Sequence, residues 1–216
     1  MSTSVLIRGL SLTLLLTVAA AVPASAQQED APPGPFVVDA HVVLPSFSTG
    51  ASLAAPLGLR TDQLPSRGLG YEIGVHVYPV RRGRFALGLG ASLLNASGDK
   101  APGADADPTD PTIKTQFSAM TPQLSLNFGG ARGWSYISGG WGWTRRSTFD
   151  ASLEDVEGAR LTGFSYGGGA RWFLSTHVAF SFDLRFYRLP QQQADGIVPY
   201  QPGYTMFVGS AGLSFK

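Results

Sequence analysis

Hydrophobic and polar residues alternate strictly along the segment 178–186, near the end of the chain. One parity is wholly apolar and the other is polar or charged: Phe180, Phe182, Leu184 and Phe186 against Ser181, Asp183 and Arg185. Because successive side chains of a strand point to opposite faces, this pattern predicts a two-faced β-strand. Its apolar face would be the core of a soluble sandwich, or the lipid-facing side of a membrane barrel.

Seven further segments show the same period of two. The eight predicted strands are 36–46, 68–78, 85–94, 113–128, 134–146, 160–173, 177–189 and 204–216. We expect Pro79 to end the second, because proline cannot donate to a ladder, and Pro122 to introduce a bulge or register change in the fourth. Each segment is about as long as the ~9–11 residues that a tilted strand needs to cross a bilayer.

The connections between these segments alternate in length, which indicates the topology. Long connections begin near Phe47, Asn95, Ser147 and Pro190, and short ones lie near Arg81, Gly130 and Ser175. An eight-stranded antiparallel up-and-down β-barrel with both termini on one side predicts this order, with short periplasmic turns and longer extracellular loops. A Greek-key sandwich does not require it.

Several aromatic residues fall close to the predicted short-turn ends: Phe36, Phe85, Phe128, Trp134, Trp172 and Phe215. Such positions are typical of an interfacial aromatic girdle around a membrane barrel. The alternative is that they are ordinary core aromatics at strand ends.

The composition favours the membrane alternative. Of the 216 residues 44% are hydrophobic and only 14% are charged, and 27 are glycine, whereas soluble domains are nearer a quarter charged. Residues 1–26 resemble a secretory signal peptide, with Arg8, an apolar run and the small-residue site Ala24-Ser25-Ala26; a membrane anchor is the alternative. We therefore expect a signal peptide over 1–26, a disordered leader over 27–35 and a barrel over 36–216.

At this level of pattern the chain resembles the small eight-stranded outer-membrane barrels of Gram-negative bacteria. This class is related to the OmpA transmembrane domain and to porin-family barrels. The resemblance rests on the signal ending at Ala26 and on the alternating last strand, 206–216. It implies an outer-membrane location, a lipid bilayer as partner, and recognition of the last strand by the outer-membrane assembly machinery. The aromatic Phe215 is followed here by Lys216, which departs from the usual terminal aromatic.

A set of charged and ionisable residues falls on the inward parity: Asp39, His41, Glu72, His76, Arg171, Asp183 and Arg185. An eight-stranded barrel is just wide enough for its own side chains, and buried charges must be paired. We expect Arg171 and Arg185 to pair with Glu72, Asp183 and Asp39. The network would then plug the lumen; the alternative is a narrow ion path or a small-ligand site.

The chain offers little other chemistry. None of its three histidines lies in a serine-plus-acid pattern, and the acidic stretch 105–110 lacks the spacing of an EF-hand loop. We predict no catalytic, cofactor or metal site. Without Arg8 the chain has 15 basic and 15 acidic residues, which gives no basic patch for nucleic acid.

The predicted role is structural, or an interaction with a cell-surface partner through the long loops. A narrow pore or small-solute channel is the first alternative. An exported soluble barrel that binds a lipid or small apolar ligand, with its apolar face turned inward, is the second.

Overall fold

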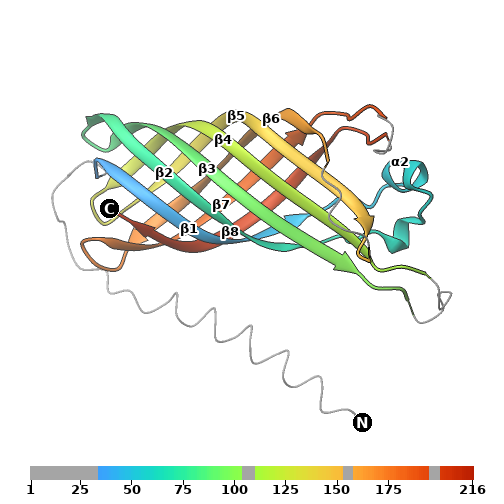
Figure 1. Cartoon of the computed structure of the whole chain (residues 1–216). Helices are drawn as coiled ribbons and strands as arrows, with labels where there is room; N and C mark the ends of the chain where they lie inside the picture. The colour runs from blue at the N-terminus through green and yellow to red at the C-terminus, as the bar shows by residue number, and fades with distance from the viewer. Residues whose placement is uncertain (1–33, 104–109, 153–157, 195–199) are drawn as a thin grey trace, which may run out of the picture.

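Eight antiparallel strands close into a barrel (Figure 1). The computed structural model describes residues 34–103, 110–152, 158–194 and 200–216. The strands are β1 (Phe36–Ser46), β2 (Leu69–Arg82), β3 (Phe85–Lys100), β4 (Ile113–Gly130), β5 (Gly133–Asp150), β6 (Arg160–Phe173), β7 (Val178–Leu189) and β8 (Tyr204–Phe215). The predicted signal peptide, 1–26, and all but the last two residues of the predicted leader lie outside the described residues.

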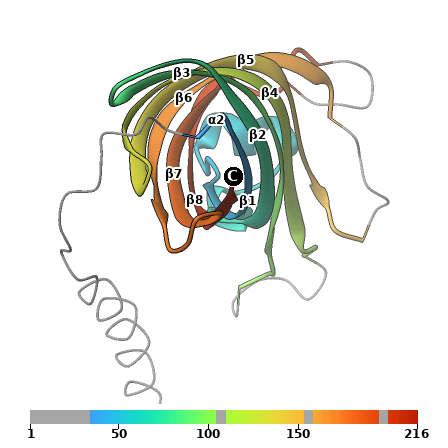
Figure 2. The ribbon, with the colours of Figure 1, turned by 90° about the vertical axis from the view of Figure 1, so that its left-hand side faces the viewer.

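The topology is up-and-down, as predicted. Each strand pairs with its neighbours in the chain, and β8 pairs with β1 from Val38↔Phe215 to Ser46↔Phe207, which leaves no open edge (Figure 2). The C-terminus and the short connections lie at one end, and the short helix α2 (Ala51–Ala54) lies at the other (Figure 1). We call these the short-turn end and the long-loop end.

The apolar parity of the strands faces outward. Leu184 at the middle of β7 is 47% exposed, whereas its neighbours Asp183 and Arg185 are buried. The same alternation runs through β1, where every second residue from Val37 to Pro45 is buried. This arrangement contradicts the soluble ligand-binding alternative, which requires the apolar face to point inward. Within the described residues, no helix has the length and apolarity to cross a membrane.

Four strands are longer than predicted. β3 runs on to Lys100, β4 to Gly130 and β5 to Asp150, and β2 extends past Tyr78 to Arg82. At the long-loop end the outward positions of β3 and β5 become polar, for example at Ser97 and Arg145. The apolar alternation that identified the strands therefore stops there, although the hydrogen-bonded ladder continues.

Neither proline acts as predicted. β2 continues through Pro79, because a one-residue register shift between Val77 and Val80 leaves the proline at an irregularity where the ladder is interrupted. Pro122 causes no register change: it pairs with Ala91 on β3. On the β5 side the pairing is skipped at residues 121 and 122 and resumes in the same register.

The long connection between β1 and β2, residues 47–68, has short helical elements. It contains α2 and the 3₁₀ turns η1 (Ala55–Leu57) and η2 (Thr61–Gln63). Leu53, Ala54 and Leu64 from this connection form a buried apolar cluster with Ile113 at the start of β4. The connection thus packs against the long-loop end of the barrel (Figure 1).

Candidate functional site in the barrel interior

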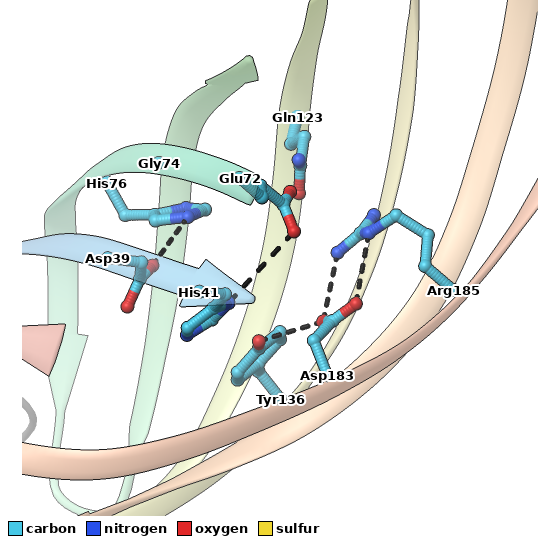
Figure 3. Close-up of a pocket in the computed structure, with 9 residues that line it drawn as sticks. All are labelled: Asp39, His41, Glu72, Gly74, His76, Gln123, Tyr136, Asp183 and Arg185. Carbon is cyan, nitrogen blue, oxygen red and sulfur yellow. Dashed lines mark hydrogen bonds and ion pairs between the residues drawn. The ribbon is translucent and has the colours of Figure 1, made fainter. Parts of the chain in front are cut away.

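The inward side chains form three layers along the barrel axis. The layer at the short-turn end is apolar, with Val37, Tyr78, Ala86 and Trp134 buried together. The layer toward the long-loop end is also apolar; it comprises Val43, Phe47, Leu94, Ala96, Phe117, Ala119, Tyr187, Leu189, Met206 and Val208. Between these two layers lies a polar middle layer, which is the candidate site (Figure 3).

Asp39 on β1 is the centre of one half of the middle layer. Its carboxylate accepts two hydrogen bonds from Arg171 on β6, from Nε at 3.0 Å and from Nη2 at 2.7 Å. His76 Nε2 lies 3.2 Å from Asp39 Oδ2 (Figure 3), and the hydroxyl of Ser214 also donates to Asp39. Arg171 is 1% exposed, so this is a buried, two-pronged ion pair, a strong geometry for arginine and carboxylate.

Asp183 on β7 is the centre of the other half. Arg185, two residues along the same strand face, donates to it from Nε and Nη2, both at 3.1 Å. Tyr136 on β5 donates its hydroxyl to Asp183 at 2.8 Å (Figure 3). The guanidinium of Arg171 lies 4.3 Å above the ring of Tyr136. Tyr136 therefore joins the two ion pairs into one network.

His41 connects the network to a third carboxylate. Its Nε2 lies 2.7 Å from the hydroxyl of Ser181, and its Nδ1 lies 4.0 Å from Glu72 Oε2. Serine, histidine and acid are thus close together, which the sequence pattern did not reveal. Ser181 is fully buried, however, so no acyl substrate can reach its hydroxyl.

The space left inside the middle layer is small. A cavity of about 10 Å³ is lined by Glu72, Gln123, Asp183 and Arg185 among others. This is close to the ~10–15 Å³ that one water molecule requires. Gln123 Oε1 and Arg185 Nη1 have no hydrogen-bond partner among the described residues, so a water molecule in the cavity would find polar groups to bind.

The structure brings all seven predicted inward residues into this layer and buries each of them. Their pairing differs from the predicted one in a single respect: Glu72 lies beside His41, whereas the two arginines pair with Asp39 and Asp183. Sequence reasoning missed the neutral members of the network, chiefly Tyr136 and the serine hydroxyls. The sequence shows that these residues lie on the inward parity. It does not single them out, because an uncharged hydroxyl on that face is common and needs no ion-pair partner.

Five of the six predicted interfacial aromatics lie on the outer wall: Phe36, Phe85, Phe128, Trp172 and Phe215. The assignment of Trp134 was wrong, since this residue is 2% exposed and points into the barrel. It packs against Tyr78 and Phe173, with ring centroids 6.0 and 5.0 Å apart. Trp134 shares its parity with Tyr136, which points inward, and not with the lipid-facing residues of β5. Its side chain therefore also points into the barrel.

Lys216 lies over the apolar layer at the short-turn end, beside Trp134 and Phe173. Its ammonium group donates to the carbonyl of Ala131 at 2.9 Å and lies 3.8 Å from the centre of the Phe173 ring. Lys216, which follows the terminal aromatic Phe215, therefore covers the apolar layer at the short-turn end.

Within the residues that the structure describes, no group of three or more histidine, cysteine, aspartate or glutamate side chains is placed to hold a metal ion. Of the acidic stretch 105–110, all but Asp110 lies outside the described residues.

Comparisons with known proteins agree with this architecture. The family model described as "Outer membrane protein beta-barrel domain" matches residues 12–215. Neisserial surface protein A, a solved structure from Neisseria, is 16% identical, with a TM-score of 0.55; the match covers 84% of this chain and 96% of that one.

Two further solved structures are more distant. OprG of Pseudomonas aeruginosa is 10% identical with a TM-score of 0.47, and covers 87% of this chain and 98% of its own. The attachment invasion locus protein Ail of Yersinia pestis is 10% identical with a TM-score of 0.46, over 84% of this chain and 95% of its own. A search of curated protein sequences gave no significant match.

Proposed function

Because the chain belongs to the outer-membrane β-barrel family, we propose that it is a closed barrel of the outer membrane with a structural or surface-interaction role. In barrels of this architecture the short turns face the periplasm and the long loops face the outside. The working surface would then be the long-loop end, where the strands that the connections 47–68, 101–112, 151–159 and 190–203 join begin or end. The partner would be a molecule at the cell surface.

The filling of the lumen is the observation that carries this proposal. One apolar layer lies on each side of the middle layer. The cavity within the middle layer has a volume of about 10 Å³. An ion that crossed would have to lose its water against apolar side chains, which is strongly unfavourable. A plugged barrel can serve as a wall element or a platform for loops, but it cannot serve as an open channel.

A narrow pore is the second candidate, and the polar middle layer is the observation that favours it. Charged groups and hydroxyls there form hydrogen bonds across the barrel, between β5 and β7, β6 and β1, and β1 and β7. These polar groups could bind a small ion in passage if both apolar layers moved aside. This requires the concerted displacement of large side chains such as Phe117 and Trp134, which are almost fully buried.

We propose no catalytic role for the interior. The grouping of Ser181, His41 and Glu72 places a hydroxyl beside an imidazole, as nucleophilic catalysis needs. The same hydroxyl is fully buried, and Ser181 is not among the residues that line the small cavity. The groups are better explained as mutual hydrogen-bond partners that neutralise buried polar atoms.

Export and assembly complete the proposal. Residues 1–26 would be removed as a signal peptide, and the last strand would be the segment that the assembly machinery recognises. The outward position of Phe215 on β8, opposite Val38 and Val178, supports the second point. N-terminal sequencing of the membrane-inserted protein should start at Gln27; a start at Met1 would contradict removal of the segment.

Trimming the loops tests the surface role and separates it from a purely structural one. We would replace residues 101–112 and 190–203 by short Gly-Ser turns and restore this variant to a deletion strain. A structural role predicts that the trimmed barrel repairs the envelope's sensitivity to detergent and chelator as well as the full chain does. A surface-interaction role predicts insertion without recovery of cell attachment. A deletion strain that differs from its parent in neither property would refute the proposal.

A further inference from the structure

Beyond the apolar layer toward the long-loop end, the inward side chains become polar again. At this level β4 contributes Thr115, and β5 contributes Arg146 and Thr148. The two threonine hydroxyls lie 3.0 Å apart, and all three residues are buried. Gln201, from the connection between β7 and β8, is buried beside Arg146. We call these four residues the mouth layer.

The mouth layer is covered from the long-loop side by the connection 47–68. Buried apolar residues of that connection, Leu53 and Leu64 among them, pack against Ile113. Ile113 is the next inward residue of β4 beyond the mouth layer. Figure 1 shows α2 of the connection at the long-loop end, and Figure 2 shows it across the opening of the barrel. The mouth layer thus lies between two apolar surfaces, where polar groups require partners.

Arg146 carries the charge of the mouth layer, and its partners are neutral. Its Nε donates to Oε1 of Gln201 at 2.6 Å, and its Nη2 donates to the carbonyl of Pro202 at 3.3 Å. Its guanidinium carbon lies 4.7 Å from the centre of the Tyr204 ring. The partners that the described residues give to Arg146 include no carboxylate.

Two further buried arginines, in the middle layer, are held differently. Arg171 donates two hydrogen bonds to the carboxylate of Asp39, and Arg185 donates two to that of Asp183. A buried charge without a counter-charge is costly, and a carboxylate is the strong partner of a buried guanidinium. The contrast indicates that the mouth layer has a place for a carboxylate that the described residues do not supply.

Two unpartnered polar atoms mark where that carboxylate would lie. Nη1 of Arg146 and the hydroxyl of Tyr204 are both buried, and neither has a hydrogen-bond partner among the described residues. Arg146 is 7% exposed, so bulk water does not replace the missing partner. A guanidinium has five N–H donors, of which two are engaged here. Because the guanidinium lies over the Tyr204 ring, one small anion can bond to both residues.

We propose that the mouth layer binds the carboxylate of a small organic acid, with Arg146 as its principal contact. The free edge of the guanidinium donates two-pronged hydrogen bonds to a carboxylate, and the Tyr204 hydroxyl adds another. A carboxylate fits better than a phosphate, because Arg146 supplies one positive charge and the rest of the mouth layer is neutral. A phosphate group brings up to about two negative charges.

The site goes beyond the proposed surface role, because it needs neither a partner for the loops nor a conducting lumen. Arg146 lies one residue beyond the last pairing of β5 with β6, which joins Arg145 to Arg160. Its partners Gln201 and Pro202 belong to a connection and not to a strand. An acid that enters from the long-loop end therefore displaces neutral contacts, which are weaker than charged ones, and leaves the barrel wall intact.

Arginine side-chain NMR of the full-length mature barrel, folded in detergent, tests the proposal. The Nε–H signal of Arg146, identified by its absence from R146K, is followed during titration with acetate, propionate, propionamide and inorganic phosphate. We expect both acids to shift this signal saturably, with dissociation constants at least fivefold lower than that of phosphate. Propionamide has the shape of propionate without its charge and should not saturate the signal. The signal of Arg188, which is exposed on the outer wall, is the internal reference and should not saturate with any probe.

Gln201→Glu is the sharpest variant, because it supplies a carboxylate to Arg146 from the chain itself with almost no change of shape. Its affinity for propionate should fall at least fivefold. Gln193→Glu adds the same charge at an exposed position of the same connection and should bind propionate within twofold of the wild type. Tyr204→Phe removes only the unpartnered hydroxyl and should weaken propionate binding by about threefold.

A wild type that responds saturably to neither acid would overturn the proposal and would show that Arg146 is already neutralised within the chain. Equal affinity for propionate and propionamide would also overturn it, because the charge would then contribute nothing. So would an unchanged affinity in Gln201→Glu, since the acid would then bind elsewhere. None of these outcomes bears on the loop-trimming test of the surface role.

Discussion

The ion pair between Asp39 and Arg171 makes the sharpest test of the interior network. The two residues are 132 positions apart in sequence and are joined by two hydrogen bonds. Asp39→Asn keeps the shape of the side chain but removes its charge and turns an amide donor toward the guanidinium. Arg171 would then be a fully buried cation without its counter-charge.

The expected magnitude follows from that loss. Breaking a buried ion pair by removing one partner costs about 3–5 kcal/mol, because the remaining charge is desolvated and uncompensated. We expect Asp39→Asn to lower the free energy of unfolding by that amount. Urea titration of the barrel in lipid vesicles, followed by tryptophan fluorescence, measures it.

A double-mutant cycle separates the pair from its surroundings. Arg171→Met should cost a similar amount, and the double variant Asp39→Asn/Arg171→Met should cost less than the sum of the two single variants by about 2–3 kcal/mol. Asp62→Asn is the control, because Asp62 pairs with Arg60 on the exposed loop surface and should change stability by less than about 1 kcal/mol. A change in Asp39→Asn no larger than in Asp62→Asn would refute the network, and so would strictly additive single variants.

Four other substitutions probe the remaining features of the barrel, the first two by thermal unfolding and the last two by the same urea titration. Arg185→Ala and Glu72→Ala should each lower the melting temperature, Arg185→Ala more, because Asp183 loses two hydrogen bonds; no change in either would contradict their place in the network. Trp134→Ala should lower the free energy of unfolding by about 3–5 kcal/mol, because Trp134 is a buried aromatic. No change in stability would contradict its inward position and support a place at the lipid interface. Leu184→Arg, at the middle of the outer wall, should cost about 2–4 kcal/mol in a bilayer, and tolerance of the charge there would contradict a lipid-facing wall.

The fold could be predicted from the sequence because one physical rule acts all along the chain. Each strand faces lipid on one side and a packed interior on the other, so a period of two is imposed on every strand. Short and long connections then give the order of the strands. The rule weakens where the wall leaves the lipid, so the sequence pattern places the end of β3 from Asn95 onward and the end of β5 from Ser147 onward in loops.

The interior partners could be predicted only as a set. Parity places Asp39 and Arg171 on the inner face, but β1 and β6 are not neighbours in the barrel. Which charges meet across the lumen depends on the tilt and register of all the strands between them. The contact of His41 with Ser181 across the lumen has the same origin, and no local pattern encodes it.

Trp134 and the prolines were misjudged for a different reason. In each case a residue-type preference was placed above the strand pattern around it. The inward parity that Trp134 shares with Tyr136 decides its direction, and the register on both sides of Pro122 is held by long runs of paired residues. Tertiary pairing over a whole strand outweighs the preference of one side chain.

Single-channel recording in planar bilayers tests the closed barrel most directly. The refolded wild-type protein in 1 M KCl should give no discrete conductance steps beyond those of a bilayer without protein, because the proposed plug includes two buried apolar layers that an ion would have to cross. An open porin of known conductance, recorded in the same bilayer, serves as the positive control that the recording detects an open lumen. Reproducible steps from the wild type, abolished by blocking substitutions inside the barrel, would contradict a closed barrel and establish a pore.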